Sequence, residues 1–265
     1  MTDVTPAPLR EPLLRLQEVT IRFGGLVAND EVNLEVAHGA VAALIGPNGA
    51  GKTTMFNVVT GALRPTSGEV FIDGQRTTGA PRRTLARLGV ARTFQNLDLV
   101  DDLTALENVT VGLGRYRRFG LLGALVGLGP SSKADRAIRD LAYRALEFVG
   151  LAPAAEVVTG ALPYGDRRRV EIARALALGP RLLILDEPSA GMGPGETAAL
   201  ATIIQRARRD LGITVLVVEH DMAFVRAVAD TTTVLELGRV IASGDTASVL
   251  EEPRVIEAYL GRSAA

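Results

Sequence analysis

The spacing of apolar residues along the chain predicts an alternation of strands and helices. Apolar residues at about every second position predict strands over residues 13–23 and 32–36. Continuous apolar runs at 41–45 and 182–185 are typical of parallel strands that are buried on both faces. Further strands are expected at residues 69–72, 90–95, 214–218, 234–237 and 240–242.

Helical patterns fill most of the segments between these strands. Thr104 and Glu107 have the spacing of a capping box, which opens a helix, and residues 134–149 have the pattern of a longer amphipathic helix. The expected helices are 53–59, 104–111, 134–149, 167–178, 195–211, 221–229 and 253–260. Strands that alternate with helices in this way favour an α/β fold with a mainly parallel sheet.

The predicted elements divide the chain into a lead and a single domain. Residues 1–12 contain three prolines and are expected to be a disordered lead, whereas residues 13–262 are expected to form one domain. Within this domain, short antiparallel strands accompany the parallel core in residues 13–95 and 166–262. Residues from about 96 to 165 lack these strands, and we expect them to form an inserted helical subdomain.

Residues 46–54 match the phosphate-binding pattern G-x-x-x-x-G-K-[ST], and they follow a buried strand and open a helix, as that pattern requires. Glycines let backbone N–H groups surround phosphate oxygens, and the helix N-terminus adds its positive dipole. We expect Lys52 to reach the β- and γ-phosphates and Thr53 to offer its hydroxyl to Mg²⁺. The residues predicted to hold the nucleotide here are Gly46, Pro47, Asn48, Gly49, Ala50, Gly51, Lys52, Thr53 and Thr54.

Polar side chains also stand at the carboxyl ends of other predicted core strands, the edge at which open α/β sheets bind ligands. Asp186 follows an apolar run and is expected to hold Mg²⁺, and Glu187 beyond it is expected to polarise an attacking water. His220 is expected to contact the γ-phosphate and to stabilise the geometry of Glu187. Gln95 is a candidate to coordinate Mg²⁺ or to bind the attacking water.

Composition excludes several classes of function. The 265 residues carry a formal net charge of −1, which gives no electrostatic case for a nucleic-acid partner. The absence of cysteine excludes disulfides and thiol catalysis. The first twelve residues lack the apolar region of a secretory signal. The longest apolar run, residues 120–129, is half of the roughly 20 residues that a spanning helix needs, so we expect no transmembrane segment.

The order of the motifs resembles that of ATP-binding subunits of ABC transporters over roughly residues 13–260. The stretches that carry the resemblance are 46–54, 94–95, 162–176, 185–188 and 219–221. Within that superfamily the chain is most similar to branched-chain amino acid uptake ATPases, in particular to the longer of their two ATPase subunits. The stretches behind this finer resemblance are 22–26, 92–95, 163–165, the insert after Val111 and 259–261.

The resemblance implies the ABC ATPase fold: a P-loop NTPase (RecA-like) core with a mainly parallel sheet, an antiparallel β subdomain and an inserted α-helical subdomain. It implies hydrolysis of ATP with Mg²⁺ in a head-to-tail dimer, formed with a paralogous ATPase subunit or with a second copy of the chain. It also implies two membrane permease subunits as partners, an indirect link to a substrate-binding protein, and a place at the cytoplasmic face of the inner membrane.

The resemblance assigns roles to further residues. ATP is expected to lie between the phosphate loop of one subunit and the signature segment of the other, which here is Pro163, Tyr164, Gly165 and Asp166. Phe23 is expected to stack on the adenine. Gln95 and its neighbours are expected to touch a coupling helix of the permease.

The chain departs from the superfamily pattern at two places. In the signature, Pro163 replaces a serine and Asp166 replaces a glutamine, so one γ-phosphate hydrogen bond is missing and a negative charge is added. We expect Asp166 to cap a helix that begins at Arg167. Gly193 stands where the superfamily usually has aspartate. Relatives tolerate such changes, and hydrolysis is still expected.

Several alternatives stay open. The leading hypothesis is the ATPase of an amino acid importer. Because the ATPase itself does not touch the cargo, amides, urea and a lipopolysaccharide precursor stay open as alternative substrates of the transporter. A non-transport ABC ATPase acting on ribosomes or DNA, and a nucleotide-dependent module without hydrolysis, are less favoured classes. The segment from Arg115 to Gly129 combines basic residues with an apolar run, and it is either a plain insert or a contact to lipid headgroups or permease.

Overall fold

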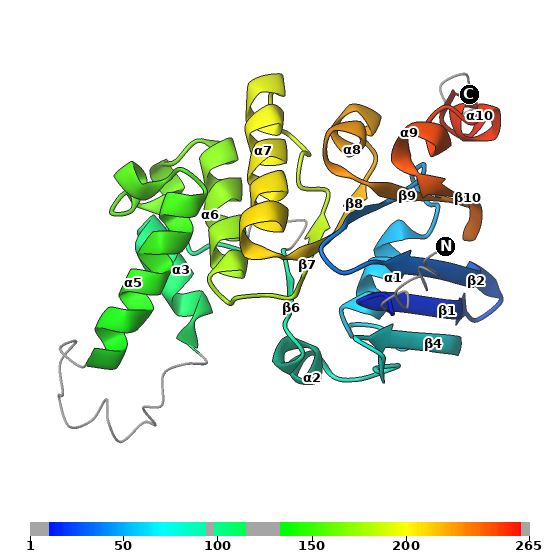
Figure 1. Ribbon diagram of the computed structural model, residues 1–265, viewed down its shortest axis with the longest axis horizontal. Coiled ribbons are helices and arrows are strands. Elements are labelled where there is room, and N and C mark those ends of the chain that lie inside the picture. The colour runs from blue at the N-terminus through cyan, green and yellow to red at the C-terminus, as the bar shows by residue number, and fades with distance from the viewer. Residues whose placement is uncertain (1–10, 94–97, 115–132, 261–265) are drawn as a thin grey trace, which may run out of the picture.

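A computed structural model describes residues 11–93, 98–114 and 133–260 of the chain (Figure 1). Its central feature is a six-stranded sheet within these described residues, with the strand order β10-β9-β3-β8-β7-β6. All neighbouring pairs are parallel except β9 and β10. The strands span Val90–Arg92 (β6), Leu182–Asp186 (β7), Val41–Ile45 (β3), Thr214–Glu219 (β8), Thr231–Glu236 (β9) and Arg239–Asp245 (β10). The mainly parallel sheet predicted from the apolar runs is confirmed.

A second, antiparallel sheet covers one face of the central sheet. Its strand order is β2-β1-β4-β5, formed by Leu14–Phe23 (β1), Leu26–Val36 (β2), Ser67–Ile72 (β4) and Gln75–Arg76 (β5). Helix α1 (Lys52–Val59) lies with this sheet on the same side of the central sheet (Figure 1), and their apolar residues share one core with Ala42, Leu44 and Ile184. The early antiparallel strands predicted from the sequence are therefore present.

Helices cover the opposite face of the central sheet. Alternate residues of the strands, such as Leu183, Leu185 and Val217, pack there in one core with α3 (Ala105–Gly112), α5 (Lys133–Phe148), α6 (Tyr164–Leu176) and α7 (Pro194–Leu211). A smaller core on β3 and β9 holds α8 (Met222–Val228), α9 (Thr246–Val249) and α10 (Pro253–Leu260). Because successive side chains of a strand point to opposite faces, burial of both faces explains the continuous apolar runs.

Helices α3, α5 and α6 gather at the end of the molecule farthest from the antiparallel sheet (Figure 1). The capping box at the start of α3 is confirmed, since Thr104 Oγ1 accepts the N–H of Glu107 at 3.1 Å and Glu107 Oε2 accepts the N–H of Thr104 at 2.8 Å. The segment Arg115–Gly129, Phe94 and Gln95 lie outside the described residues. In the part of the chain that is described, we find no helix with the length and apolarity needed to span a bilayer.

The start of α6 differs from the prediction. The sequence placed it at Arg167, but the helix begins at Tyr164 and Pro163 is its N-cap, with φ of −55° and ψ of 154°. Proline has no N–H to contribute and its φ suits a helix start, so the turn-like Pro-Tyr-Gly opens the helix instead of preceding it. Asp166 is therefore the third helical residue and not the cap, and its carboxylate pairs with Arg169 one turn later.

Short elements escaped the pattern analysis. Helix α2 (Arg82–Arg87), helix α9 and two 3₁₀ turns, Ala152–Ala154 and Thr159–Ala161, each have too few residues to show a helical period. Strand β2 begins at Leu26, six residues before its alternating part. These differences leave the layers unchanged.

Candidate functional site

The loop between β3 and α1 approaches other backbone segments so closely that glycine is required. Gly51 has a φ of +96°, and a Cβ there would lie 2.4 Å from Nδ2 of Asn29 and 2.7 Å from the carbonyl oxygen of Ala28. A Cβ on Gly46 would lie 2.2 Å from the carbonyl oxygen of Leu235. The loop therefore packs against β2 and β9, and these contacts hold its backbone N–H groups next to the start of α1.

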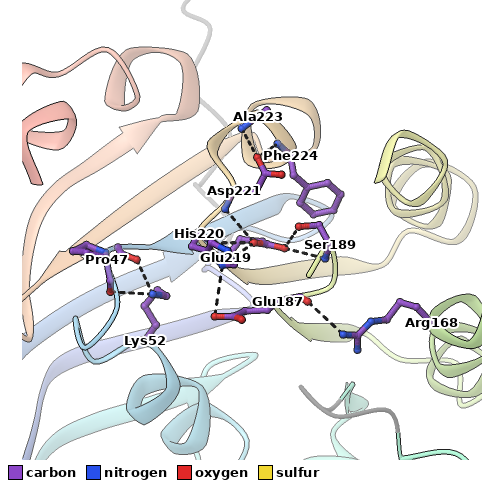
Figure 2. A network of polar contacts seen from close by, with 11 residues as sticks. Pro47, Lys52, Arg168, Glu187, Ser189, Glu219, His220, Asp221, Ala223 and Phe224 are labelled. Carbon is purple, nitrogen blue, oxygen red and sulfur yellow. Dashed lines mark hydrogen bonds and ion pairs between the residues drawn. The ribbon is translucent and has the colours of Figure 1, made fainter. Parts of the chain in front are cut away.

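Lys52 is buried at the centre of this loop. Its ammonium group donates to the carbonyl oxygen of Gly46 at 2.6 Å and to that of Pro47 at 3.1 Å (Figure 2). Burial lowers the pKa of Lys52, whereas the negative charges of Glu187 and Asp186 act in the opposite direction. An ammonium has three donors, so a third remains for a ligand beyond the two carbonyl oxygens.

A cavity of about 550 Å³ opens beside the loop. Residues 48–54 and Glu187 line it, together with residues 26–28 of β2 and Leu237 in the turn between β9 and β10. Leu26 and Leu237 are 66% and 72% exposed, so the cavity joins exposed apolar side chains to a loop rich in N–H donors. A flat aromatic ring attached to phosphates matches that combination.

Residues 26–28 and Leu237 were not found from the sequence. Leu237 has a φ of +47°, and Gly238 after it donates its N–H to the carbonyl oxygen of Ala50 at 3.1 Å, which fixes the turn on the loop. The turn itself was predicted, but its contact with residues nearly 190 positions earlier leaves no trace in the sequence. Phe23 pairs with Leu26 across the β1–β2 hairpin and is 50% exposed, while Leu26 lines the cavity. The stacking role of Phe23 stays a prediction.

A larger groove of about 910 Å³ lies between the two sheets, lined by β1, β2, β9 and β10. Its lining includes the Arg239–Asp30 ion pair and several threonine and glutamate side chains, and it contains none of the predicted site residues. We assign the site to the smaller cavity, because the phosphate loop and Glu187 converge there.

The carboxyl ends of β7 and β8 bring three more predicted residues together. Asp186 is 5% exposed, and burial, reinforced by the charge of Glu187, raises its pKa to about 6, although Arg168 and Arg92 act against the shift. His220 Nδ1 lies 3.7 Å from Oε1 of Glu187. The charges of Asp186 and Glu187 both act on the pKa of Lys52, so the two carboxylates lie near its ammonium group. Lys52, Asp186, Glu187 and His220 therefore form one cluster.

Glu219 is a structural centre of the site that the sequence analysis left without a role. Its side chain is fully buried and accepts four hydrogen bonds (Figure 2). Two come from Ser189, from N–H at 3.0 Å and from Oγ at 2.5 Å, and two come from the N–H groups of His220 at 2.8 Å and Asp221 at 3.2 Å. The carboxylate thus ties the loop after Glu187 to the loop that carries His220. Its place directly after the apolar run of β8 was the available clue.

Tyr164 and Gly165 of the signature segment pack against residues 191–196 of their own chain, and none of residues 163–166 lines the cavity. A Cβ on Gly165 would lie 2.2 Å from Oε1 of Glu196, and the ring of Tyr164 would lie 3.4 Å from a Cβ on Gly191. Gly193 donates its N–H to Oε2 of Glu196 at 2.9 Å and so begins α7. Gly193 therefore occupies the N-cap position of α7, where the aspartate was expected, and Glu196 supplies the capping carboxylate.

The protein's oxygen atoms at this site fit a magnesium ion only if a bound ligand supplies further oxygens. Among the described residues, no three His, Cys, Asp or Glu side chains converge on a common metal position. Mg²⁺ usually takes one or two protein oxygens together with phosphates and water. Thr53, which lines the cavity, and Asp186, at the end of the neighbouring β7, are oxygen donors of this type.

Comparison with known proteins places the chain among transport ATPases. A family model described as ABC transporter matches residues 29–190, and one described as branched-chain amino acid ATP-binding cassette transporter matches residues 239–265. The high-affinity branched-chain amino acid transport ATP-binding protein BraF of Pseudomonas aeruginosa is 41% identical over 96% of this chain and 100% of its own length.

Two solved structures extend the comparison. An ATP-binding cassette of an ABC transporter in its ADP conformation is 32% identical, with a TM-score of 0.83 over 94% of this chain and 99% of that one. A dimeric cassette in a post-hydrolysis state, bound to ADP and Pi, is 28% identical, with a TM-score of 0.73 over 88% of this chain and 98% of that one. The fold expected from the motif order is confirmed by these neighbours.

The raised pKa of Asp186 predicts a stability difference for Asp186→Asn. A carboxyl whose pKa rises from 3.8 to about 6 on folding binds protons more tightly when folded, so the free energy of unfolding falls as pH rises through this window. A neutral Asn avoids this loss. Without Mg²⁺ or nucleotide, Asp186→Asn should be more stable than the wild type at pH 7.5 by about 1–3 kcal/mol.

Urea unfolding at pH 7.5 and pH 4.5 in the presence of a chelator measures this difference. The gap between variant and wild type should shrink at pH 4.5, where the folded wild-type carboxyl is already protonated, and it should approach zero only below pH 3.8, where the unfolded carboxyl is protonated as well. A gap of equal size at both pH values would show that the charge of Asp186 is not its cause.

Proposed function

The chain belongs to the ABC transporter family of ATP-binding proteins, and we propose that it hydrolyses ATP to power a branched-chain amino acid importer. One observation carries the catalytic part of this proposal: Lys52, Asp186, Glu187 and His220 converge at one edge of the sheet, beside the cavity of the phosphate loop. The substrate class rests on the similarity to BraF and on the second family model at the C-terminus.

Each part of the cavity has a role in binding ATP. The N–H groups of the loop and the donor of Lys52 that remains beyond its bonds to Gly46 and Pro47 bind the phosphates. Leu26 and Leu237 supply apolar surface for the base. Thr53 and Asp186 hold the Mg²⁺, which neutralises charge on the phosphates when bound.

The hydrolytic step depends on Glu187 and His220. The carboxylate of Glu187 lines the cavity and accepts a hydrogen bond from the attacking water. As the water adds to the γ-phosphorus, Glu187 takes up its proton, the bond from the γ-phosphorus to the bridging oxygen breaks, and ADP leaves with that oxygen. His220, half exposed and 3.7 Å from Glu187, donates to the γ-phosphate oxygens and fixes the carboxylate. Gln95 lies outside the described residues, and its role as an additional ligand remains a proposal.

The functional unit is a dimer of cassettes. Pro163–Asp166 do not line their own cavity, so a second subunit, either a paralogous ATPase or another copy, provides this segment to the bound ATP. The dimeric arrangement of a similar cassette supports this assembly. The partner's Pro-Tyr-Gly-Asp segment offers the N–H of glycine but none from proline, so it binds the γ-phosphate through fewer donors than a serine-containing signature.

The remaining partners follow from the role of the relatives as transport subunits. Two permease subunits in the membrane receive the motion of the dimer, and a substrate-binding protein delivers the amino acid to them. The chain then works at the cytoplasmic face of the inner membrane. The segment Arg115–Gly129 is the candidate contact to lipid or permease that the sequence offers.

Glu187→Gln tests the catalytic assignment. The amide keeps the size of the side chain but cannot take up a proton, so ATP binding should persist while hydrolysis falls at least ~100-fold, the scale of a lost general base. Phosphate release and equilibrium binding of ATP are the two measurements. Equal turnover in the wild type and in Glu187→Gln would remove Glu187 from this role.

A dilution series tests the dimer. Because one chain contributes the phosphate loop and another the signature, the purified subunit should show weak ATPase activity whose specific rate rises with protein concentration. Addition of the paralogous ATPase subunit and the permeases should raise it further. Full activity in a dilute sample that light scattering shows to be monomeric would contradict the proposal.

A further inference from the structure

A buried ion pair lies inside the signature helix α6. Arg168 and Glu171 are each 1% exposed, and Nη1 of Arg168 donates to Oε2 of Glu171 at 2.7 Å. Charged side chains are rarely buried to this extent, because their desolvation is expensive even when they are paired. Packing alone therefore gives no reason for an arginine here, since an apolar pair would fill the same space at lower cost.

The second amino group of Arg168 reaches beyond its own helix. Nη2 makes a long hydrogen bond to the carbonyl oxygen of Glu187 at 3.4 Å (Figure 2). It makes a second long hydrogen bond to the hydroxyl of Tyr164 at 3.5 Å. The planar guanidinium thus joins Glu171 of the signature helix to the backbone of the residue that faces the cavity. Both groups that it joins belong to the same subunit.

The backbone of Glu187 is held in an unfavourable conformation. Its φ is +43°, in the left-handed region that residues with a Cβ rarely adopt. Three contacts fix it there: its N–H donates to Val218 at 2.8 Å, and its carbonyl oxygen accepts from the N–H of Ala190 at 3.2 Å and from Arg168. This conformation sets the direction in which the carboxylate of Glu187 leaves the chain, beside His220.

We propose that Arg168 is a positioning residue for Glu187, and that Glu171 holds Arg168 in place for this purpose. The inference rests on the proposed function, in which Glu187 polarises the attacking water. In the proposed dimer, the signature helix α6 meets the nucleotide of the partner subunit. Through Arg168 the same helix also contacts Glu187 of its own subunit. Movement of α6 then changes the hydrogen bond to Glu187 directly.

Removal of the whole ion pair separates positioning from stability. Arg168→Met alone leaves the charge of Glu171 buried without its partner and should lower the melting temperature. Arg168→Met combined with Glu171→Leu removes both charges and should restore the melting temperature. Arg139→Met is the matched control, because Arg139 on α5 forms an exposed ion pair with Glu156.

The double variant should bind ATP with wild-type affinity, since Lys52 and the phosphate loop are untouched. Its turnover at saturating ATP should be at least ~10-fold lower, because a small displacement of a reacting group has a large effect on rate. The assay uses the full chain at a concentration where wild-type activity has reached its plateau. A double variant with restored stability and wild-type turnover would overturn the inference.

A crystal structure of the nucleotide-free double variant gives a second readout that does not depend on hydrolysis. The φ of Glu187 should leave the left-handed region and the distance from Glu187 to His220 should change; an unchanged Glu187 would overturn the inference. If the wild type itself fails to hydrolyse ATP, the proposed function fails, and this structure still decides the role of Arg168. Should the double variant not fold, Arg168→Lys keeps a buried charge but not the planar fork, and the same two readouts apply to it.

Discussion

The structure depends on a buried lysine that shares the carboxyl edge of the central sheet with three carboxylates. Lys52, Asp186 and Glu219 are all nearly inaccessible to solvent, and Glu187 borders them. Such a group of charges is tolerable only if each is bonded or compensated. Lys52 is bonded to two loop carbonyl oxygens and Glu219 accepts four hydrogen bonds, whereas Asp186 keeps a pKa of about 6. The folded chain therefore keeps an incompletely compensated carboxylate at Asp186, and we propose that a cation bound together with the phosphates compensates it.

The loops of the site are fixed by contacts from distant parts of the chain. Glu219 holds the loop after Glu187 through Ser189, and Gly238 holds the phosphate loop through Ala50. Arg168 connects the signature helix to the carbonyl oxygen of Glu187. Each contact joins a different element to the same edge, so the geometry needed for hydrolysis is built from the sheet, from its turns and from the helical end of the molecule.

Much of this arrangement was predictable from sequence, because the physical cause lies in local patterns. The buried strands β3 and β7 show as continuous apolar runs, and the glycines and Lys52 of the phosphate loop form a motif with a fixed mechanism. The start of α6 was wrong by three residues, since Pro163, Tyr164 and Gly165 have turn composition but open a helix. The contacts of Leu237, Glu219 and Arg168 were not predictable, because each reaches a segment that is remote in sequence, although the place of Glu219 at the end of the apolar run of β8 was a clue.

Titration calorimetry of ATP binding to the wild type and to Lys52→Met, with Mg²⁺ present, tests the central claim most directly. If the buried ammonium binds the phosphates at residues 46–54, the wild type should bind one ATP per chain and the variant should bind at least ~10-fold more weakly, as expected for the loss of charge-assisted hydrogen bonds. Equal affinities in the two proteins would show that ATP is bound elsewhere, and the assignment of this cavity would be wrong.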